Sequence, residues 1–177
     1  MFKDNCSCNN TAPVAPVLSP DDATIKQIQA SRDRKSLSDP VYIRFNMVMN
    51  SETKVVLQSL NWMVDALQLL AWSAEDRYCV HHASLEAINN AIEHGNKYKK
   101  TKKIYFSGSL SSERVILRFR DEGKGFDLSR VMDPTTQNRI TRPRGRGLFL
   151  MQKFMTAVRY NFAKKELTLT KKPTRAK

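Results

Sequence analysis

Two polar side chains, one helical turn apart, have the most direct chemical meaning in this sequence. Glu86 and Asn90 belong to the segment Glu86-Ala-Ile-Asn-Asn90-Ala-Ile-Glu-His-Gly95. Residues four positions apart share one face of a helix. A carboxylate there can accept a proton, and a neighbouring carboxamide oxygen suits Mg²⁺, which takes oxygen ligands. Alone, each residue is most often a solvated helix-surface side chain. The functional interpretation of the pair therefore depends on two segments further along the chain.

Two glycine-rich turns make up those segments. The first is Asp121-Glu-Gly123-Lys-Gly125-Phe, and the second is Gly145-Arg-Gly147. A turn aspartate often only satisfies its own backbone, but two glycines within three residues also allow the backbone to approach a planar ligand. The second turn opens a helix, whose free N–H groups and positive dipole end favour a phosphate. Together the three stretches predict a nucleotide site.

These stretches resemble the N, G1 and G2 boxes of the GHKL ATPase superfamily, which also includes DNA gyrase and the histidine kinases. The patterns E-A-x-x-N-A-x-x-H-G, D-E-G-x-G-F and G-x-G-L-x-L-M are most similar to the small anti-sigma-factor serine/threonine protein kinases. The resemblance covers roughly Val41 to Thr170. It implies a Bergerat ATP-binding fold, as in histidine kinase-like ATPase domains, with ATP and Mg²⁺ as cofactors.

The resemblance also implies roles for individual residues. Glu86 is then the catalytic base that deprotonates a serine or threonine hydroxyl, and the side-chain oxygen of Asn90 holds Mg²⁺. Asp121 accepts a hydrogen bond from the adenine amino group. The family usually has a Gly-Thr pair before its last strand, whereas this chain reads Lys164-Lys165. Some phosphate or base contacts of the family are therefore expected to be missing.

Three arginines, Arg142, Arg144 and Arg146, supply positive charge for a triphosphate. One of them is expected to act on the transferring phosphoryl group, and the sequence leaves open which one. They end the segment from Asp127 to Arg146, which lacks a clear hydrophobic period. We expect this segment to be a lid that ATP orders. A solvated surface loop is the alternative.

The function implied by the resemblance is that of an ATP- and Mg²⁺-dependent serine/threonine kinase. Such a protein acts as an anti-sigma factor in a partner-switching system, and its expected partners are a sigma factor and the anti-sigma-factor antagonist that it phosphorylates. The alternative is a nucleotide-sensing protein-binding module of the same fold with little catalysis. Intact Glu86 and Asn90 favour the kinase, and the altered last box favours the module.

The composition excludes several other classes of protein. The net charge is +13, with 8 basic and 11 acidic residues in 1–96 (net −3) against 22 basic and 6 acidic residues in 97–177 (net +16). Aromatic residues are not interleaved with the basic clusters, so direct nucleic-acid binding is not expected. No apolar run is long enough to cross a membrane, and three cysteines do not suggest a disulfide scaffold. We expect a cytoplasmic protein without a membrane contact, and a homodimer is left open.

Local patterns predict the elements that position these residues. Residues 1–40 are expected to form a flexible tail with a short helix from Ser19-Pro20 to about Arg34, residues 41–170 the ATP-binding domain, and residues 171–177 a basic tail. The fold class is an α/β (α+β) two-layer sandwich, with a mixed, mostly antiparallel sheet covered by helices on one face. The expected elements are strand 41–47, helix 53–72 (capped by Ser51 or Thr53), helix 73–95 (begun by Ser73, with Asp76 three residues on), strands 104–110 and 114–120, helix 148–155 and strands 157–162 and 167–170.

Overall fold

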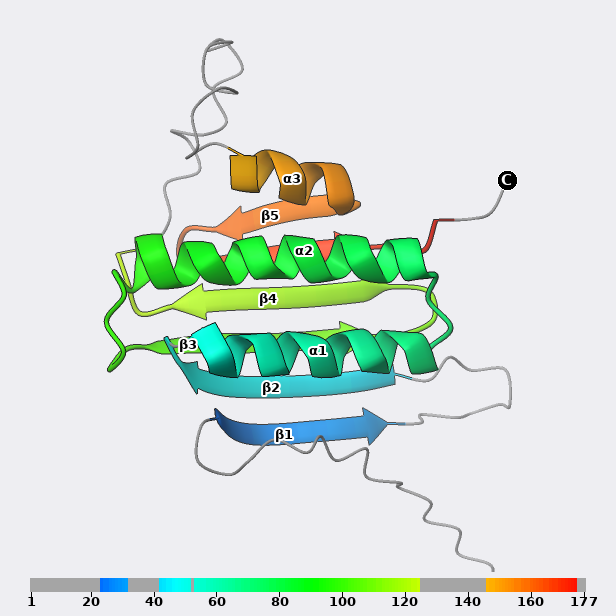
Figure 1. Ribbon diagram of the computed structural model, residues 1–177, viewed down its shortest axis with the longest axis horizontal. Coiled ribbons are helices and arrows are strands. Elements are labelled where there is room, and N and C mark those ends of the chain that lie inside the picture. Colours follow the sequence, from blue (N-terminus) through cyan, green and yellow to red (C-terminus); the bar gives the residue numbers. More distant parts are fainter. Residues whose placement is uncertain (1–22, 32–41, 52, 125–145, 175–177) are drawn as a thin grey trace, which may run out of the picture.

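The computed structural model describes residues 23–31, 42–51, 53–124 and 146–174. It confirms the expected two-layer arrangement, because the helices lie on one side of a single sheet (Figure 1). The elements follow in the order β1 (Ala23–Ser31), β2 (Tyr42–Asn50), α1 (Thr53–Leu69), α2 (Ala74–Asn90), the π-helical turn η1 (Ala91–Gly95), β3 (Lys103–Leu110), β4 (Val115–Asp121), α3 (Arg146–Phe154), β5 (Ala157–Asn161) and β6 (Glu166–Lys171).

The sheet has six strands in the order β1-β2-β3-β4-β6-β5, and every recorded pairing is antiparallel. The prediction of a mixed sheet is therefore wrong. Two helices separate β2 from β3, so the chain returns in the opposite direction. One helix separates β4 from β5, which makes these two strands run the same way, but β6 lies between them and pairs with both (Figure 1).

The predicted helix near the N-terminus is also wrong where the structure describes it. Residues Ala23–Ser31 form strand β1, which pairs with β2 from Ala23 opposite Met49 to Ser31 opposite Tyr42. A short isolated helix has little stability of its own, whereas the edge of β2 offers a row of backbone partners. Residues 1–22 and 32–41 lie outside the described part of the chain.

The core lies between the helices and the sheet. In β2 the side chains at Ile43, Phe45, Met47 and Met49 are buried, and those between them are less so. Such alternation directs every second side chain toward the helices. Helix α1 covers them with residues at three- and four-residue spacing, as predicted, among them Val56, Leu60, Met63 and Leu67. The opposite face of β2, β3 and β4 carries polar and charged side chains such as Arg44, Asn46, Ser107, Arg118 and Arg120.

The N-terminal end of α2 is held by a buried carboxylate. Ser73 caps the helix by accepting a hydrogen bond from the Asp76 backbone N–H, as the sequence predicts. The Asp76 side chain accepts from Ser73 Oγ at 3.1 Å, from the Thr174 N–H at 2.9 Å and from Thr174 Oγ1 at 2.8 Å, and it pairs with Lys171 Nζ at 3.1 Å. Burial alone would raise the pKa of Asp76, but hydrogen bonds from these three partners hold it below its ordinary value.

The same contacts change the expected boundary of the C-terminal tail. Lys171 is the last residue of β6, and Thr174 is bonded to Asp76 at the start of α2. Residues 171–174 therefore pack as part of the domain. Residues 175–177 lie outside the described part of the chain.

Candidate functional site

Glu86 and Asn90 lie on α2, both half-buried, as their spacing predicts. Helix α3 packs against α2 beside this pair, at Gly147. A Cβ atom built on Gly147 would lie 2.6 Å from Glu86 Oε2 and 3.8 Å from Asn90 Nδ2. A side chain at position 147 would displace the Glu86 carboxylate, so Gly147 lets the N-terminal end of α3 lie against the carboxylate–carboxamide pair. The second glycine turn and the α2 pair thus belong to one site.

Beyond Asn90 the helix widens into the π-helical turn η1, whose end is marked by the Asn96 N–H donating to the Ala91 carbonyl at 2.7 Å. Such turns occur often at functional sites. Gly95 closes the turn against β4, because a Cβ atom there would lie 2.3 Å from Asp121 Cγ. The helical segment ends at Gly95, as the sequence predicts, and the missing side chain makes room for the Asp121 carboxylate.

Asp121 ends β4 on the helix side of the sheet, where it continues the alternation of Val115, Leu117 and Phe119. Its Oδ1 accepts a hydrogen bond from the Gly123 N–H at 2.7 Å. Burial raises the pKa of the Asp121 carboxyl above its ordinary value, and this hydrogen bond lowers it only in part. Asp121 is thus a half-buried carboxylate that faces the helix layer.

The neighbouring acid of the same turn has a different position. The Glu122 carboxylate accepts from the Lys103 N–H at 2.8 Å and from the Tyr105 hydroxyl at 3.1 Å, both on β3. Gly123 passes so close to η1 that a Cβ atom on it would lie 2.2 Å from the Gly95 carbonyl oxygen. Glu122 and Gly123 therefore fix the turn, and Asp121 is the acid left facing the helices.

Asn96 is a residue that the sequence analysis missed. It is fully buried. Its Nδ2 donates to Ser51 Oγ at 2.6 Å and to the Lys103 carbonyl at 2.9 Å, and its Oδ1 accepts from the Glu122 N–H at 3.0 Å. One side chain thereby ties the end of η1 to the residue after β2, to β3 and to the turn after Asp121. An asparagine just after a helix is common, so only its place directly after His94-Gly95 could have drawn attention to it.

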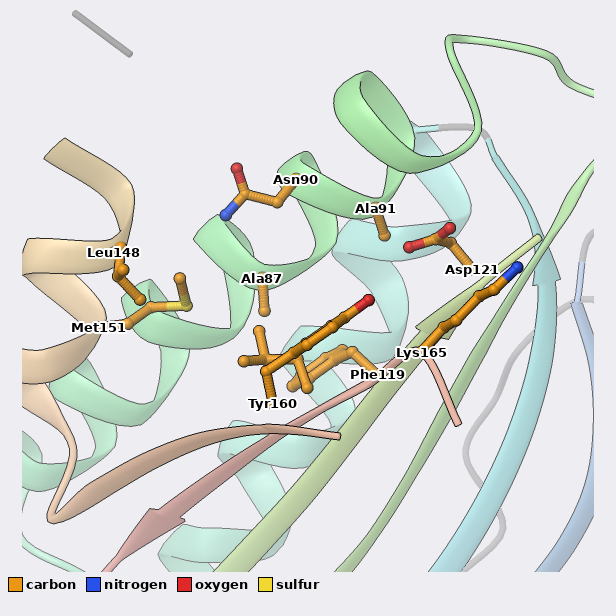
Figure 2. A pocket seen from close by; sticks show the side chains of 10 residues that line it. Ala87, Asn90, Ala91, Phe119, Asp121, Leu148, Met151, Tyr160 and Lys165 are labelled. Carbon is orange, nitrogen blue, oxygen red and sulfur yellow. The ribbon is translucent and has the colours of Figure 1, made fainter. Parts of the chain in front are cut away.

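A pocket lies between these elements. Figure 2 shows Asp121 and Lys165 at one end and Leu148 and Met151 of α3 at the other. Small side chains of α2 and η1 and aromatic side chains of the sheet lie between the two ends. Apolar walls with a few polar groups are typical of small-molecule sites. The lining residues are Ala87, Asn90, Ala91, Phe119, Asp121, Leu148, Met151, Tyr160, Lys165 and Leu167.

Of the ten lining residues, only Asn90 and Asp121 were predicted as site residues. Tyr160 and Lys165 are the other two with polar groups. Tyr160 pairs in register with the buried Leu167 of β6, which places it on the helix side of β5. The alternation of the predicted strand shows which residues share a face with Tyr160, but only the register against β6 decides which face points toward the helices. Lys165 stands where the family usually has its Gly-Thr pair, and that departure was the only signal.

Residues 50–171 match the model of the histidine kinase-like ATPase domain. The chain belongs to this family. Its similar proteins include the serine/threonine-protein kinase BtrW of Bordetella bronchiseptica, 27% identical over 104 residues, which are 58% of this chain and 73% of that protein. They also include the anti-sigma F factors of Bacillus velezensis, 40% identical, and Bacillus subtilis, 38% identical, each over 76 residues. Those matches span 41% of this chain and about half (51%) of each factor.

The matched region of this histidine kinase-like ATPase domain includes every residue that lines the pocket. Several predicted site residues remain untested, because Gly125, Arg142, Arg144 and Gly145 lie outside the described part of the chain. Arg146 is the first residue of α3. The expected lid, Asp127 to Arg146, falls almost entirely in that undescribed stretch.

Within the described residues, no group of three or more His, Cys, Asp or Glu side chains is arranged to hold a metal ion. A Mg²⁺ site does not require such a cage, because Mg²⁺ is usually bound through one or two protein oxygens, substrate phosphates and water. The Asn90 carboxamide beside the Glu86 carboxylate is a donor set of that kind. None of the helices in the described part of the chain has the length and apolarity that a membrane crossing requires.

Proposed function

We propose that this chain is an ATP- and Mg²⁺-dependent serine/threonine protein kinase that acts as an anti-sigma factor in a cytoplasmic partner-switching system. The observation that carries the proposal is the contact of Gly147 with Glu86, which joins the α2 pair to the start of α3 beside a pocket that ends at Asp121. The family and the names of its relatives support the same class of activity.

In this proposal the base of ATP lies between the apolar walls of the pocket, and the Asp121 carboxylate accepts a hydrogen bond from the adenine amino group. The phosphates extend toward α3, where Gly145 and Gly147 allow the backbone N–H groups at the helix N-terminus to approach them. Arg142, Arg144 and Arg146 supply the charge complement of the triphosphate. The side-chain oxygen of Asn90 is the proposed protein ligand of Mg²⁺.

Glu86 is the proposed catalytic base. It accepts the proton of a serine or threonine hydroxyl on the antagonist as that oxygen bonds to the γ-phosphorus. The bond from the γ-phosphorus to the bridging oxygen breaks, and ADP leaves. Mg²⁺, when bound, neutralises charge on the phosphate oxygens. The exchange of ATP for ADP would then bias the choice between the sigma factor and the antagonist, which is a coupling between two binding sites.

The test replaces the base without removing volume. Glu86→Gln is expected to keep ATP binding and to reduce phosphoryl transfer by about 10²- to 10⁴-fold. Glu75→Gln is the matched control, because it makes the same change at an exposed position on the same helix. The acceptor is first recovered by pull-down on the immobilised chain in ATP and in ADP, and then purified and incubated with ATP labelled at the γ-phosphate. Equal transfer by Glu86→Gln and wild type would place the base elsewhere.

A nucleotide-sensing module with little catalysis is the second candidate, and it is favoured by Lys165 at the position of the family's Gly-Thr pair. The same assay separates the two candidates. A wild-type chain that changes its partner between ATP and ADP, but transfers no phosphate to the partner it recovers, would support the module over the kinase.

A further inference from the structure

Lys165 has an unusual backbone conformation beside the pocket. It is the last residue of the turn from β5 to β6, where its N–H donates to the Phe162 carbonyl at 3.3 Å and the Lys164 N–H donates to Asn161 Oδ1 at 3.0 Å. The φ angle of Lys165 is 51°. This left-handed region favours glycine, and other residues found there often belong to functional sites.

The ammonium of Lys165 lies at the Asp121 end of the pocket. The residue as a whole is exposed, yet its Nζ donates to the Gly123 carbonyl at 3.1 Å, and its side chain lines the pocket (Figure 2). A lysine ammonium has three donors, so this bond leaves two more. The positive charge also lowers the pKa of Asp121, although burial still dominates that shift. An acceptor and a donor therefore stand together where a ligand would enter.

We propose that Lys165 reads the nucleotide base together with Asp121, by donating a hydrogen bond from Nζ to N1 of adenine. This inference rests on the proposed function, in which Asp121 accepts from the adenine amino group. On adenine the amino donor and the N1 acceptor are neighbours, so a carboxylate beside an ammonium complements that edge. Guanine presents a carbonyl oxygen and an N1–H donor at the same positions, which opposes both protein groups.

A structural role is the alternative, in which Lys165 only fixes Gly123 or offsets the charge of Asp121. The two roles differ in what they predict for a ligand that lacks N1. A contact with N1 disappears when either the ligand atom or the lysine is removed, and removing both causes no further loss. A structural lysine changes the affinity of both ligands equally.

The experiment measures binding of ATP and of 1-deaza-ATP, in which a C–H group replaces N1, by calorimetry of the full chain with Mg²⁺. We expect wild type to bind ATP about tenfold more tightly than 1-deaza-ATP, in line with the loss of one hydrogen bond to a charged group. Lys165→Gly is expected to bind ATP about tenfold more weakly than wild type and to treat both ligands alike. Lys164→Gly, in the same turn but not lining the pocket, is the control and is expected to behave as wild type.

Glycine at position 165 suits the positive φ, so Lys165→Gly should fold and unfold thermally no earlier than wild type. The inference is overturned if Lys165→Gly still prefers ATP to 1-deaza-ATP by the wild-type factor, or if wild type shows no preference. Absence of ATP binding by wild type is a separate result. It would overturn the proposed function, and this inference with it.

Discussion

Asp76 lies in the first turn of α2, and Asp121 lies against Gly95 at the other end of the helical segment formed by α2 and η1. The surroundings of the two carboxylates are opposite. Asp76 is 1% exposed and receives hydrogen bonds or an ion pair from three residues, which hold its pKa below the ordinary value. Asp121 receives one recorded hydrogen bond, from Gly123, and burial raises its pKa. One carboxylate is fully partnered by the protein, and the other keeps acceptor capacity.

This difference separates a structural acid from a candidate binding acid. A buried carboxylate whose partners are all in place is a structural group, because removing one member of such a pair is strongly destabilising. A partly buried carboxylate with few partners costs stability, and such perturbed groups cluster at functional sites. The N-terminal end of α2 therefore anchors the domain, and its C-terminal end is left available for a ligand.

The largest expected effect comes from removing the anchor. Asp76→Ala leaves the Lys171 ammonium, whose side chain is 12% exposed, without its counter-charge. Breaking a buried pair in this way costs about 3–5 kcal/mol of the free energy of unfolding. Urea unfolding measures this loss, with Asp65→Ala as an exposed control on α1. Adding Lys171→Met to Asp76→Ala should recover part of the loss. Equal stability of Asp76→Ala and Asp65→Ala would contradict the anchoring role of Asp76.

A smaller loss is expected at the other end of the segment from Asn96→Ala. The change leaves the Glu122 N–H and the Lys103 carbonyl without their partner, at a cost of about 1–3 kcal/mol. Because Asn96 also fixes the turn after Asp121, ATP affinity should fall in conditions where the variant is folded.

Ser51→Ala is the matched control, because it removes another partner of Asn96 and leaves the Glu122 contact intact. It should lower stability without changing ATP affinity. If Asn96→Ala lowered stability but left ATP affinity unchanged, Asn96 would have no role in positioning the Asp121 turn.

The smallest effects should appear in the pH dependence of stability, with opposite signs for the two aspartates. The folded pKa of Asp76 is lowered, so its contribution is present above the unfolded value of about 4 and is lost as pH falls through the folded pKa. The folded pKa of Asp121 is raised, so its charge costs stability above that pKa, and the cost disappears below the unfolded value.

Urea unfolding between about pH 3 and pH 7 tests both signs. Asp76→Asn should be less stable than wild type at neutral pH, and the difference should shrink in acid. Asp121→Asn should be at least as stable as wild type at neutral pH, and its advantage should also shrink in acid. A loss of stability in Asp121→Asn at neutral pH would mean that Asp121 is a structural acid like Asp76.

The sequence predicted the parts of this comparison that depend on short-range spacing. The four-residue interval of Glu86 and Asn90, the Ser73 cap and the Asp121 turn are local patterns, and the structure contains all three. Asn96 was missed because its side-chain partner Ser51 lies 45 residues away, and its meaning depends on which strands meet η1. β1 was mistaken for a helix because its structure depends on the edge of β2.

The most direct test of the account is calorimetry of Mg²⁺-ATP and Mg²⁺-GTP binding by wild type and by Asp121→Asn. The amide keeps the size of the side chain but removes the charge and one acceptor. Wild type should prefer ATP to GTP, and Asp121→Asn should stay folded while losing at least about tenfold in ATP affinity together with the preference. Equal ATP and GTP affinities in wild type, or unchanged binding in Asp121→Asn, would contradict the claim that Asp121 reads the base.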